Sequence, residues 1–115
     1  MVNDRRTIRD LQERVYRANM SLTEYGLVTA TFGNVSGIDR GAGIIAIKPS
    51  GVHYDRLSPE KIVLVDLECR VIEGDLNPSS DTKTHVALYR AFAEIGGIVH
   101  THSTYATAWS QAIKP

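Results

Sequence analysis

Two histidines separated by one residue, His100 and His102, are the side chains whose types and spacing most clearly suggest chemistry. They lie in a short apolar segment, residues 98–103, which predicts a buried β-strand. Side chains two apart on a strand share a face, with Cα atoms ~6.5–7 Å apart, so both imidazoles can reach one ion at the ~2.0–2.1 Å bond length of zinc. The pair therefore indicates a divalent-metal site, although a His-x-His pair also occurs by chance on protein surfaces.

Asp81 supplies a third candidate ligand. It stands at the start of a predicted helix whose Gly96-Gly97 end leads directly into the histidine strand. Short connections keep successive elements adjacent in space, so a helix running back over the sheet brings this carboxylate near the C-terminal end of that strand. A carboxylate with imidazole nitrogens suits Zn²⁺, and Mn²⁺, Co²⁺ and Fe²⁺ stay open. The alternative is that Asp81 only caps its helix, which contributes about 1 kcal/mol.

Three turn segments combine small side chains with hydroxyl or amide donors: residues 31–34, 49–51 and 78–80. Gly33 and Gly51 allow backbone N–H groups to approach a ligand closely, and Ser79 and Ser80 stand at a helix N-terminus, which favours an anion. Lys48 adds a positive charge beside the second segment. Any one of these segments alone would be an ordinary turn, but the three together predict a phosphate site next to the metal.

Three other residues could carry chemistry, and each has a simpler interpretation. His85 follows Asp81 by one helical turn and can face the same region, and a supporting role is favoured over metal ligation. His53 is expected to be solvated in a loop. Cys69, the single cysteine, cannot form an internal disulfide and is expected to be an unreactive thiol.

The elements that must position these groups form a mixed α/β pattern. Apolar residues at spacings of three and four predict a first helix over residues 4–24, and a second helix runs from Asp81 to Gly96-Gly97. The predicted strands are residues 27–38 with an interruption at 33–34, 44–47, 62–67, 71–72 and 98–103, and a last helix covers 106–113. This order favours a largely antiparallel central sheet with helices on its faces.

The composition limits the classes of protein that fit. The chain has 115 residues, 43% of them hydrophobic and 23% charged, with a net charge of zero, which describes one soluble globular domain. A neutral chain gives no support for a nucleic-acid or anionic-membrane partner. No segment approaches the ~20 apolar residues of a membrane span, and the charged N-terminal region has no secretory h-region. Together with the lone cysteine, this favours the reducing cytoplasm.

Four ordered segments carry a family resemblance that runs in register from about residue 11 to the last residue. They are Gly33-Asn34-Val35-Ser36, Lys48-Pro49-Ser50-Gly51-Val52, Pro78-Ser79-Ser80-Asp81 and Gly97-Ile98-Val99-His100-Thr101-His102-Ser103. These segments resemble the class II aldolase/adducin family, and most closely its L-ribulose-5-phosphate 4-epimerase branch.

The resemblance implies a zinc-dependent enzyme with a three-layer α/β fold, usually a homotetramer. In the family, the positions matching Asp81, His100 and His102 bind the metal, and Asp81 is also the expected catalytic group. The positions that bind substrate, largely through its phosphate, match Gly33, Asn34, Ser50, Gly51, Ser79 and Ser80. Aldolase members usually carry glutamate at the position of Asp81, so aspartate favours the epimerase branch.

The implied reaction interconverts L-ribulose 5-phosphate and D-xylulose 5-phosphate by breaking and re-forming the C3–C4 bond of this phosphorylated ketopentose. One alternative is a class II aldolase of the fuculose or rhamnulose phosphate type, which releases the aldehyde. Another is a non-catalytic, adducin-like assembly module, against which the intact ligand residues argue.

The length departs from the family pattern, because family enzymes are roughly twice as long. The third metal histidine, a later catalytic acid and a C-terminal tyrosine of the family have no counterpart in the sequence. Residues 1–115 are therefore interpreted as one class II aldolase/adducin-type domain truncated at its C-terminus, either a fragment or a shortened relative, and inactive alone.

Overall fold

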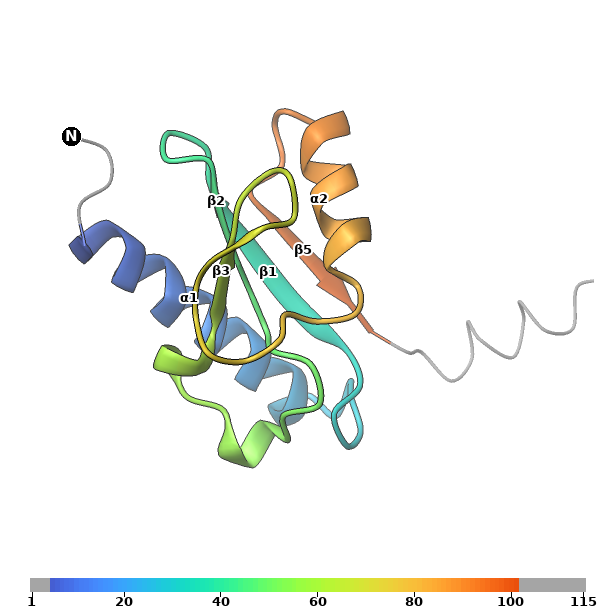
Figure 1. Ribbon diagram of the computed structural model, residues 1–115. Helices are drawn as coiled ribbons and strands as arrows, with labels where there is room; N and C mark the ends of the chain where they lie inside the picture. Colours follow the sequence, from blue (N-terminus) through green and yellow to red (C-terminus); the bar gives the residue numbers. More distant parts are fainter. Residues whose placement is uncertain (1–4, 102–115) are drawn as a thin grey trace, which may run out of the picture.

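The computed structural model describes residues 5–101, which form two helices, five strands and two short 3-10 turns (Figure 1). In chain order these are α1 (Arg5–Glu24), β1 (Asn34–Asp39), β2 (Ile44–Ile47), η1 (Tyr54–Arg56), η2 (Pro59–Lys61), β3 (Val63–Val65), β4 (Val71–Glu73), α2 (Thr82–Ala91) and β5 (Gly97–His100).

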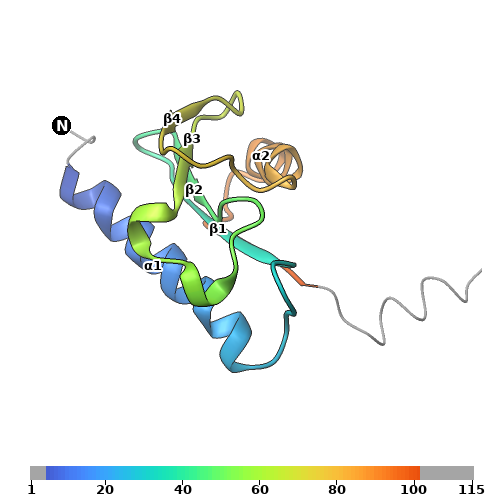
Figure 2. The same ribbon diagram turned by 60° about the horizontal axis from the view of Figure 1, so that its bottom comes forward.

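The strands form one sheet in the order β4-β3-β2-β1-β5, and every pair is antiparallel. The two helices cover opposite faces, α1 on one side and α2 on the other (Figure 2). The predicted three-layer α/β fold with a central antiparallel sheet is confirmed. Within this sheet Asn34 pairs directly with His100, so the first residue of β1 and the last of β5 lie side by side.

Each face of the sheet has its own apolar core. The core under α1 contains Leu11, Val15, Ile44, Ala46, Leu57, Ile62 and Leu64. The core under α2 contains Ile38, Ile45, Val63, Val65, Val86 and Tyr89. Because β2 and β3 are covered on both faces, they are apolar at every position instead of alternating.

The end of α2 nearest the β1–β2 turn is held by Arg40. Its guanidinium donates hydrogen bonds to the carbonyls of Tyr89 at 2.8 Å, Phe92 at 2.7 Å and Ile95 at 2.9 Å. The Tyr89 carbonyl in the last turn of α2 has no intrahelical partner, and the Phe92 and Ile95 carbonyls lie just beyond the end of the helix. Arg40 therefore fixes the C-terminal end of α2 to the sheet, while the N-terminal end carries the candidate site.

Several predicted boundaries are wrong, and the largest error concerns residues 27–33. This segment turns instead of forming a strand, because Ala30 and Gly33 adopt positive φ angles of 53° and 79°, which extended chain does not contain. The second helix ends at Ala91, well before Gly96-Gly97, because Phe92 is extended. Strand β3 is shorter than predicted, and the two 3-10 turns were not predicted.

The predicted helix over residues 106–113 and the end of the histidine strand lie outside the described residues. Within residues 5–101, no helix is long and apolar enough to cross a membrane.

Candidate functional site

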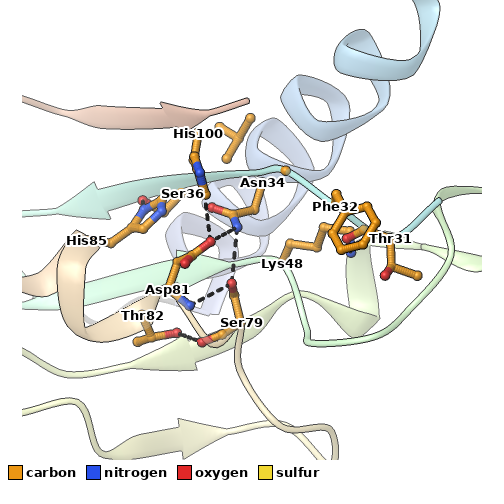
Figure 3. A network of polar contacts seen from close by, with 12 residues as sticks. Thr31, Phe32, Asn34, Ser36, Lys48, Ser79, Asp81, Thr82, His85 and His100 are labelled. Atoms are coloured by element: carbon orange, nitrogen blue, oxygen red, sulfur yellow. Dashed lines mark hydrogen bonds and ion pairs between the residues drawn. The ribbon is translucent and has the colours of Figure 1, made fainter. Parts of the chain in front are cut away.

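The candidate site lies where β1 begins, β5 ends and α2 begins (Figure 3). The pairing of Asn34 with His100 places both on the face of the sheet that α2 covers. The turn before α2 brings Asp81 to the same place. Sequence spacing predicted that Asp81 and His100 would be neighbours, and the structure brings them together.

The carboxylate of Asp81 joins this cluster through one oxygen. Oδ2 accepts hydrogen bonds from Asn34 Nδ2 at 2.9 Å and from His100 Nδ1 at 2.7 Å. No cap hydrogen bond from the Asp81 side chain is present at the start of α2. The alternative that Asp81 merely caps its helix is therefore wrong, because the carboxylate is directed at Asn34 and His100.

The surroundings of Asp81 favour its ionised form. Burial by itself raises the pKa of this carboxyl, but the hydrogen bonds from Asn34 and His100 and the nearby imidazoles of His100 and His85 outweigh that effect. The net result is a pKa below the ordinary value of an aspartate. Asp81 thus remains an anion at neutral pH, as a metal ligand or a base requires.

Ser79 is the residue that organises the start of α2. Its Oγ accepts hydrogen bonds from Asn34 Nδ2 and from the Asp81 backbone N–H, both at 3.1 Å. Its carbonyl accepts a hydrogen bond of 2.6 Å from the Thr82 hydroxyl. With two donors directed at its oxygen, Ser79 keeps its own hydroxyl proton to donate to another group.

Asn34 contains a buried oxygen without a partner. Its side chain is 4% exposed, and Oδ1 has no hydrogen bond within the described residues. An unpaired buried oxygen costs about 1–3 kcal/mol, and strain, a catalytic role, a water or an ion can explain such an atom. A donor on a bound molecule or a water would remove this cost.

The loops predicted from the sequence meet around one pocket of about 400 Å³. Its walls include every predicted site residue that the structure describes, namely Gly33, Asn34, Ser50, Gly51, Ser79, Ser80, Asp81 and His100. The second and third loops are joined by backbone hydrogen bonds from Ser50 to Asn77 at 2.8 Å and from Ser79 to Lys48 at 3.0 Å. His102 lies outside the described residues, so its place in the site stays a prediction.

Lys48 lies beside the second loop, as predicted, but it is buried and its donors contact the backbone. It is 2% exposed, and Nζ donates to the carbonyls of Val52 at 2.8 Å, Thr31 at 3.3 Å and Pro49 at 3.4 Å. The ammonium also lies 4.8 Å from the ring centre of Tyr54, and burial lowers the pKa of Lys48. Lys48 thus ties the first two loops together, with its donors directed at the backbone.

Tyr54 has a related role that sequence reasoning missed. Its hydroxyl donates to the carbonyls of Phe32 at 2.9 Å and Gly33 at 2.8 Å, and burial raises the pKa of this phenol to about 12. A tyrosine in a loop carries no signal in one sequence that would identify it as a support for a distant turn.

The substitution Lys48→Met tests whether Lys48 supports the loops. Methionine fills similar space but leaves the carbonyls that Lys48 contacts without their donor, so we expect a loss of about 1–3 kcal/mol in the free energy of unfolding. Lys61→Met is the matched control, because Lys61 is an exposed residue that contacts one surface carbonyl, that of Arg56, and should change stability by less than about 0.5 kcal/mol. Urea unfolding measures both, and equal losses would show that Lys48 is not a support.

The other two histidines behave as the sequence suggested. His85 is 1% exposed, and its Nδ1 lies 2.6 Å from Ser36 Oγ, so it is buried beside the site. Burial lowers the pKa of His85, and the opposing effect of the nearby Asp81 charge does not cancel this. His53 is exposed and lies 3.4 Å from Asp55.

The donor set suits a zinc ion in its chemistry. Asp81 and His100 offer a carboxylate oxygen and an imidazole nitrogen in contact with each other, and zinc accepts both. Residues 5–101 alone contain no cluster of three or more His, Cys, Asp or Glu side chains that could hold a metal. The described part of the chain therefore supplies two candidate ligands, and a complete set requires a further one.

Residues 13–115 match the family model described as the class II aldolase and adducin N-terminal domain. An L-fuculose 1-phosphate aldolase is 34% identical, with a TM-score of 0.83 over 88% of this chain and 48% of that chain. YgbL from Escherichia coli is 31% identical, with a TM-score of 0.81 over 90% of this chain and 49% of that one.

A third solved structure, the L-fuculose-1-phosphate aldolase of Thermus thermophilus, is 32% identical, with a TM-score of 0.71 over 90% of this chain and 51% of that one. The chain thus spans about half the length of the solved structures it matches. The family model, the shared fold and the sequence identities all agree. The chain therefore belongs to the class II aldolase and adducin N-terminal domain family.

Proposed function

We propose that this domain forms the metal and phosphate side of an enzyme that breaks and re-forms a carbon–carbon bond in a phosphorylated ketose. The reaction that we infer is the interconversion of L-ribulose 5-phosphate and D-xylulose 5-phosphate. The observation that carries the proposal is the convergence of Asn34, Asp81 and His100 on a pocket whose remaining walls are serine- and glycine-bearing loops.

The phosphate would be held by the loop residues Ser50, Gly51, Ser79 and Ser80. The Ser79 hydroxyl has its proton available, as its two accepted hydrogen bonds require. Ser79 and Ser80 also precede the N-terminus of α2, where the helix dipole favours a negative group. The buried charge of Lys48 lies in the wall of the same pocket, which makes the pocket more favourable for an anion.

Asp81, His100 and His102 would hold a zinc ion, with Mn²⁺ or Co²⁺ as alternatives. When bound, the ion supplies Lewis-acid stabilisation of the charge that develops on the substrate oxygens as the carbon–carbon bond breaks. The protein's own part is to orient the ligands. Asn34 donates to the Asp81 oxygen that also contacts His100, which keeps the carboxylate ionised and fixed in direction.

The aldolase reaction is the second candidate. Two of the similar structures are L-fuculose 1-phosphate aldolases. The description of YgbL names three activities, those of an aldolase, an epimerase and a decarboxylase. Asp81 supports the epimerase, since the resemblance places glutamate there in aldolases. We extend the proposal to a homotetramer, as the resemblance implies, and to the cytoplasm, which the lone cysteine favours.

A product assay with the protein as encoded in full separates these reactions. With L-ribulose 5-phosphate, we expect D-xylulose 5-phosphate to form without free glycolaldehyde phosphate. Release of dihydroxyacetone phosphate and an aldehyde from L-fuculose 1-phosphate, with no epimer from the pentose, would replace the epimerase by the aldolase. No turnover of either sugar phosphate would contradict both and favour an assembly module.

Ser80→Ala tests the phosphate assignment. The substitution removes one hydroxyl donor, and a hydrogen bond to a charged group contributes about 1.5–3 kcal/mol, so kcat/KM for the sugar phosphate should fall roughly ten- to hundredfold. The loss should be much smaller for the same sugar without phosphate. Ser21→Ala is the control, since this serine donates only to the Arg17 carbonyl on α1. Equal losses with both sugars would show that Ser80 acts elsewhere.

A further inference from the structure

A second pocket adjoins the first and shares Asp81 and His100 as lining residues. It has a volume of about 510 Å³, and α2 and β5 supply its other walls. These walls are Thr84, His85, Leu88, Ile98, Val99 and Thr101. The Asp81–His100 pair therefore stands at the junction of a loop-lined pocket and one that mixes apolar side chains with hydrogen-bonding groups.

We propose that His85 is locked in the neutral Nε2–H tautomer and presents this N–H to an oxygen atom of the ligand in the second pocket. The ligand portion would be the one that does not carry the phosphate, and the accepting group a hydroxyl or carbonyl oxygen. This inference rests on the proposed function for the identity of the ligand. The tautomer itself follows from the hydrogen bonds that link Tyr89, Ser36 and His85.

The tautomer is held by three buried polar side chains that are linked by hydrogen bonds. Tyr89 is fully buried, and its hydroxyl lies 2.8 Å from Ser36 Oγ. Ser36 Oγ in turn lies 2.6 Å from His85 Nδ1. Ser36 is 1% exposed and Tyr89 is fully buried, so water does not compete for the hydrogen bonds of these two hydroxyl groups.

The number of protons on these three side chains fixes the direction of the hydrogen bonds between them. Tyr89 has one hydroxyl proton, and the only acceptor within its reach among the described residues is Ser36 Oγ. Once Tyr89 donates to Ser36, the serine proton has His85 Nδ1 as its acceptor. Nδ1 must then carry a lone pair, so the neutral ring bears its proton on Nε2.

The reverse direction leaves a group unsatisfied. If His85 Nδ1 carried a proton, it would donate to Ser36, and Ser36 would either donate to Tyr89 or accept from Tyr89 as well. In the first case the Tyr89 proton, and in the second the Ser36 proton, would have no acceptor at a buried position, and an unpaired buried donor is unfavourable. The same count disfavours the doubly protonated ring, since it too places a proton on Nδ1.

The second ring nitrogen of His85, Nε2, lies on the opposite edge of the ring from Nδ1. Nε2 of His85 has no hydrogen-bond partner within residues 5–101, yet it is not among the fully buried polar atoms of that region that lack a partner, and His85 is one of the residues that line the second pocket. An N–H there cannot bind a metal, which requires a lone pair on the nitrogen. It can donate to a neutral oxygen, and the apolar walls formed by Leu88 and Ile98 suit the carbon skeleton beside that oxygen.

The tautomer is tested by nitrogen-15 NMR of the full protein labelled at histidine, without added metal or sugar. Two-bond correlations distinguish the Nε2–H ring, the Nδ1–H ring and the imidazolium, and His85→Gln assigns the His85 signals by their disappearance. We expect the Nε2–H pattern at neutral pH. Either of the other two patterns would overturn the inference, whatever reaction the protein performs.

Two substitutions separate the donor from the structural role. His85→Gln keeps an N–H near the position of Nε2, whereas His85→Asn keeps an acceptor near Nδ1 for Ser36 but lacks the distant donor. We expect the asparagine variant to lose roughly three- to tenfold in kcat/KM for L-ribulose 5-phosphate, as expected for one neutral hydrogen bond, and the glutamine variant to lose less.

The opposite order, with asparagine the more active, would show that His85 only supports the fold. Thermal melting of both variants provides the structural readout. If even the wild-type protein turned over no sugar phosphate, the proposed function would fail together with the ligand assignment, whereas the NMR result would still decide the tautomer.

Discussion

Asp81→Asn is expected to lower kcat/KM for the ketose phosphate by about a thousandfold or more. The change preserves size but removes the negative charge that Asn34 and His100 surround. A metal held through this carboxylate loses a charged ligand, and Lewis-acid stabilisation of several kcal/mol depends on it. A thousandfold loss corresponds to about 4 kcal/mol. Steady-state kinetics with L-ribulose 5-phosphate, with zinc content measured in parallel, checks this result.

Asp66→Asn is the matched control for this substitution. Asp66 also has a pKa below its ordinary value, because of hydrogen bonds from the Arg70 and Glu68 backbone and from the Arg70 side chain, against a smaller opposing effect of burial. It lies in the turn between β3 and β4 and is not among the residues that line the two pockets beside Asp81. Its loss should leave kcat/KM within about twofold of wild type. An Asp81→Asn enzyme with wild-type kinetics would remove Asp81 from the chemistry.

Gly33→Ala is expected to reduce the free energy of unfolding by about 2–5 kcal/mol. Gly33 has a φ of 79°, which costs a residue with a side chain about 1–2 kcal/mol. An added Cβ would also overlap Val28 Cγ1 and lie 3.1 Å from the carbonyl oxygen of His100, and overpacking costs about 1–3 kcal/mol more. Relief of these contacts requires a shift of Gly33 relative to Val28 and the end of β5.

Gly43→Ala separates the two contributions. Gly43 has a similar φ of 68°, but an added Cβ would have no atom within 4 Å. This control should lose only the conformational part, about 1–2 kcal/mol. Urea unfolding of both variants gives the comparison, and the same loss at both positions would mean that Gly33 is not tightly packed against Val28 and the end of β5.

The architecture was largely predictable because its signals are local. The apolar spacing of α1 and the continuous apolar runs of β2 and β3 each follow from burial on one face or on two. The segment before Asn34 was not predictable, since Ala30 adopts a positive φ that its residue type disfavours. Its conformation is set by tertiary contacts, including the hydrogen bonds of Tyr54 and Lys48 to its carbonyls.

The candidate site was predictable where residue type and order carried the information. Side chains that could hold a metal or a phosphate were identified by their chemistry, and the short link from α2 to β5 predicted that Asp81 would lie near His100. The supporting residues were not predictable, because Ser36, Tyr54 and Tyr89 act through partners distant in the sequence. The sequence placed a positive charge at Lys48 beside the second loop, and only the fold shows that its donors are directed at backbone carbonyls.

The central claim is that one metal ion is held by Asp81, His100 and His102, and elemental analysis of the purified full-length protein tests it most directly. We expect about one zinc per chain in the wild-type protein and in the His53→Ala control, which removes an exposed histidine. The double substitution His100→Ala/His102→Ala should leave a folded protein without stoichiometric metal. Unchanged zinc content in the double variant would contradict the assignment and, with it, the proposed function of the site.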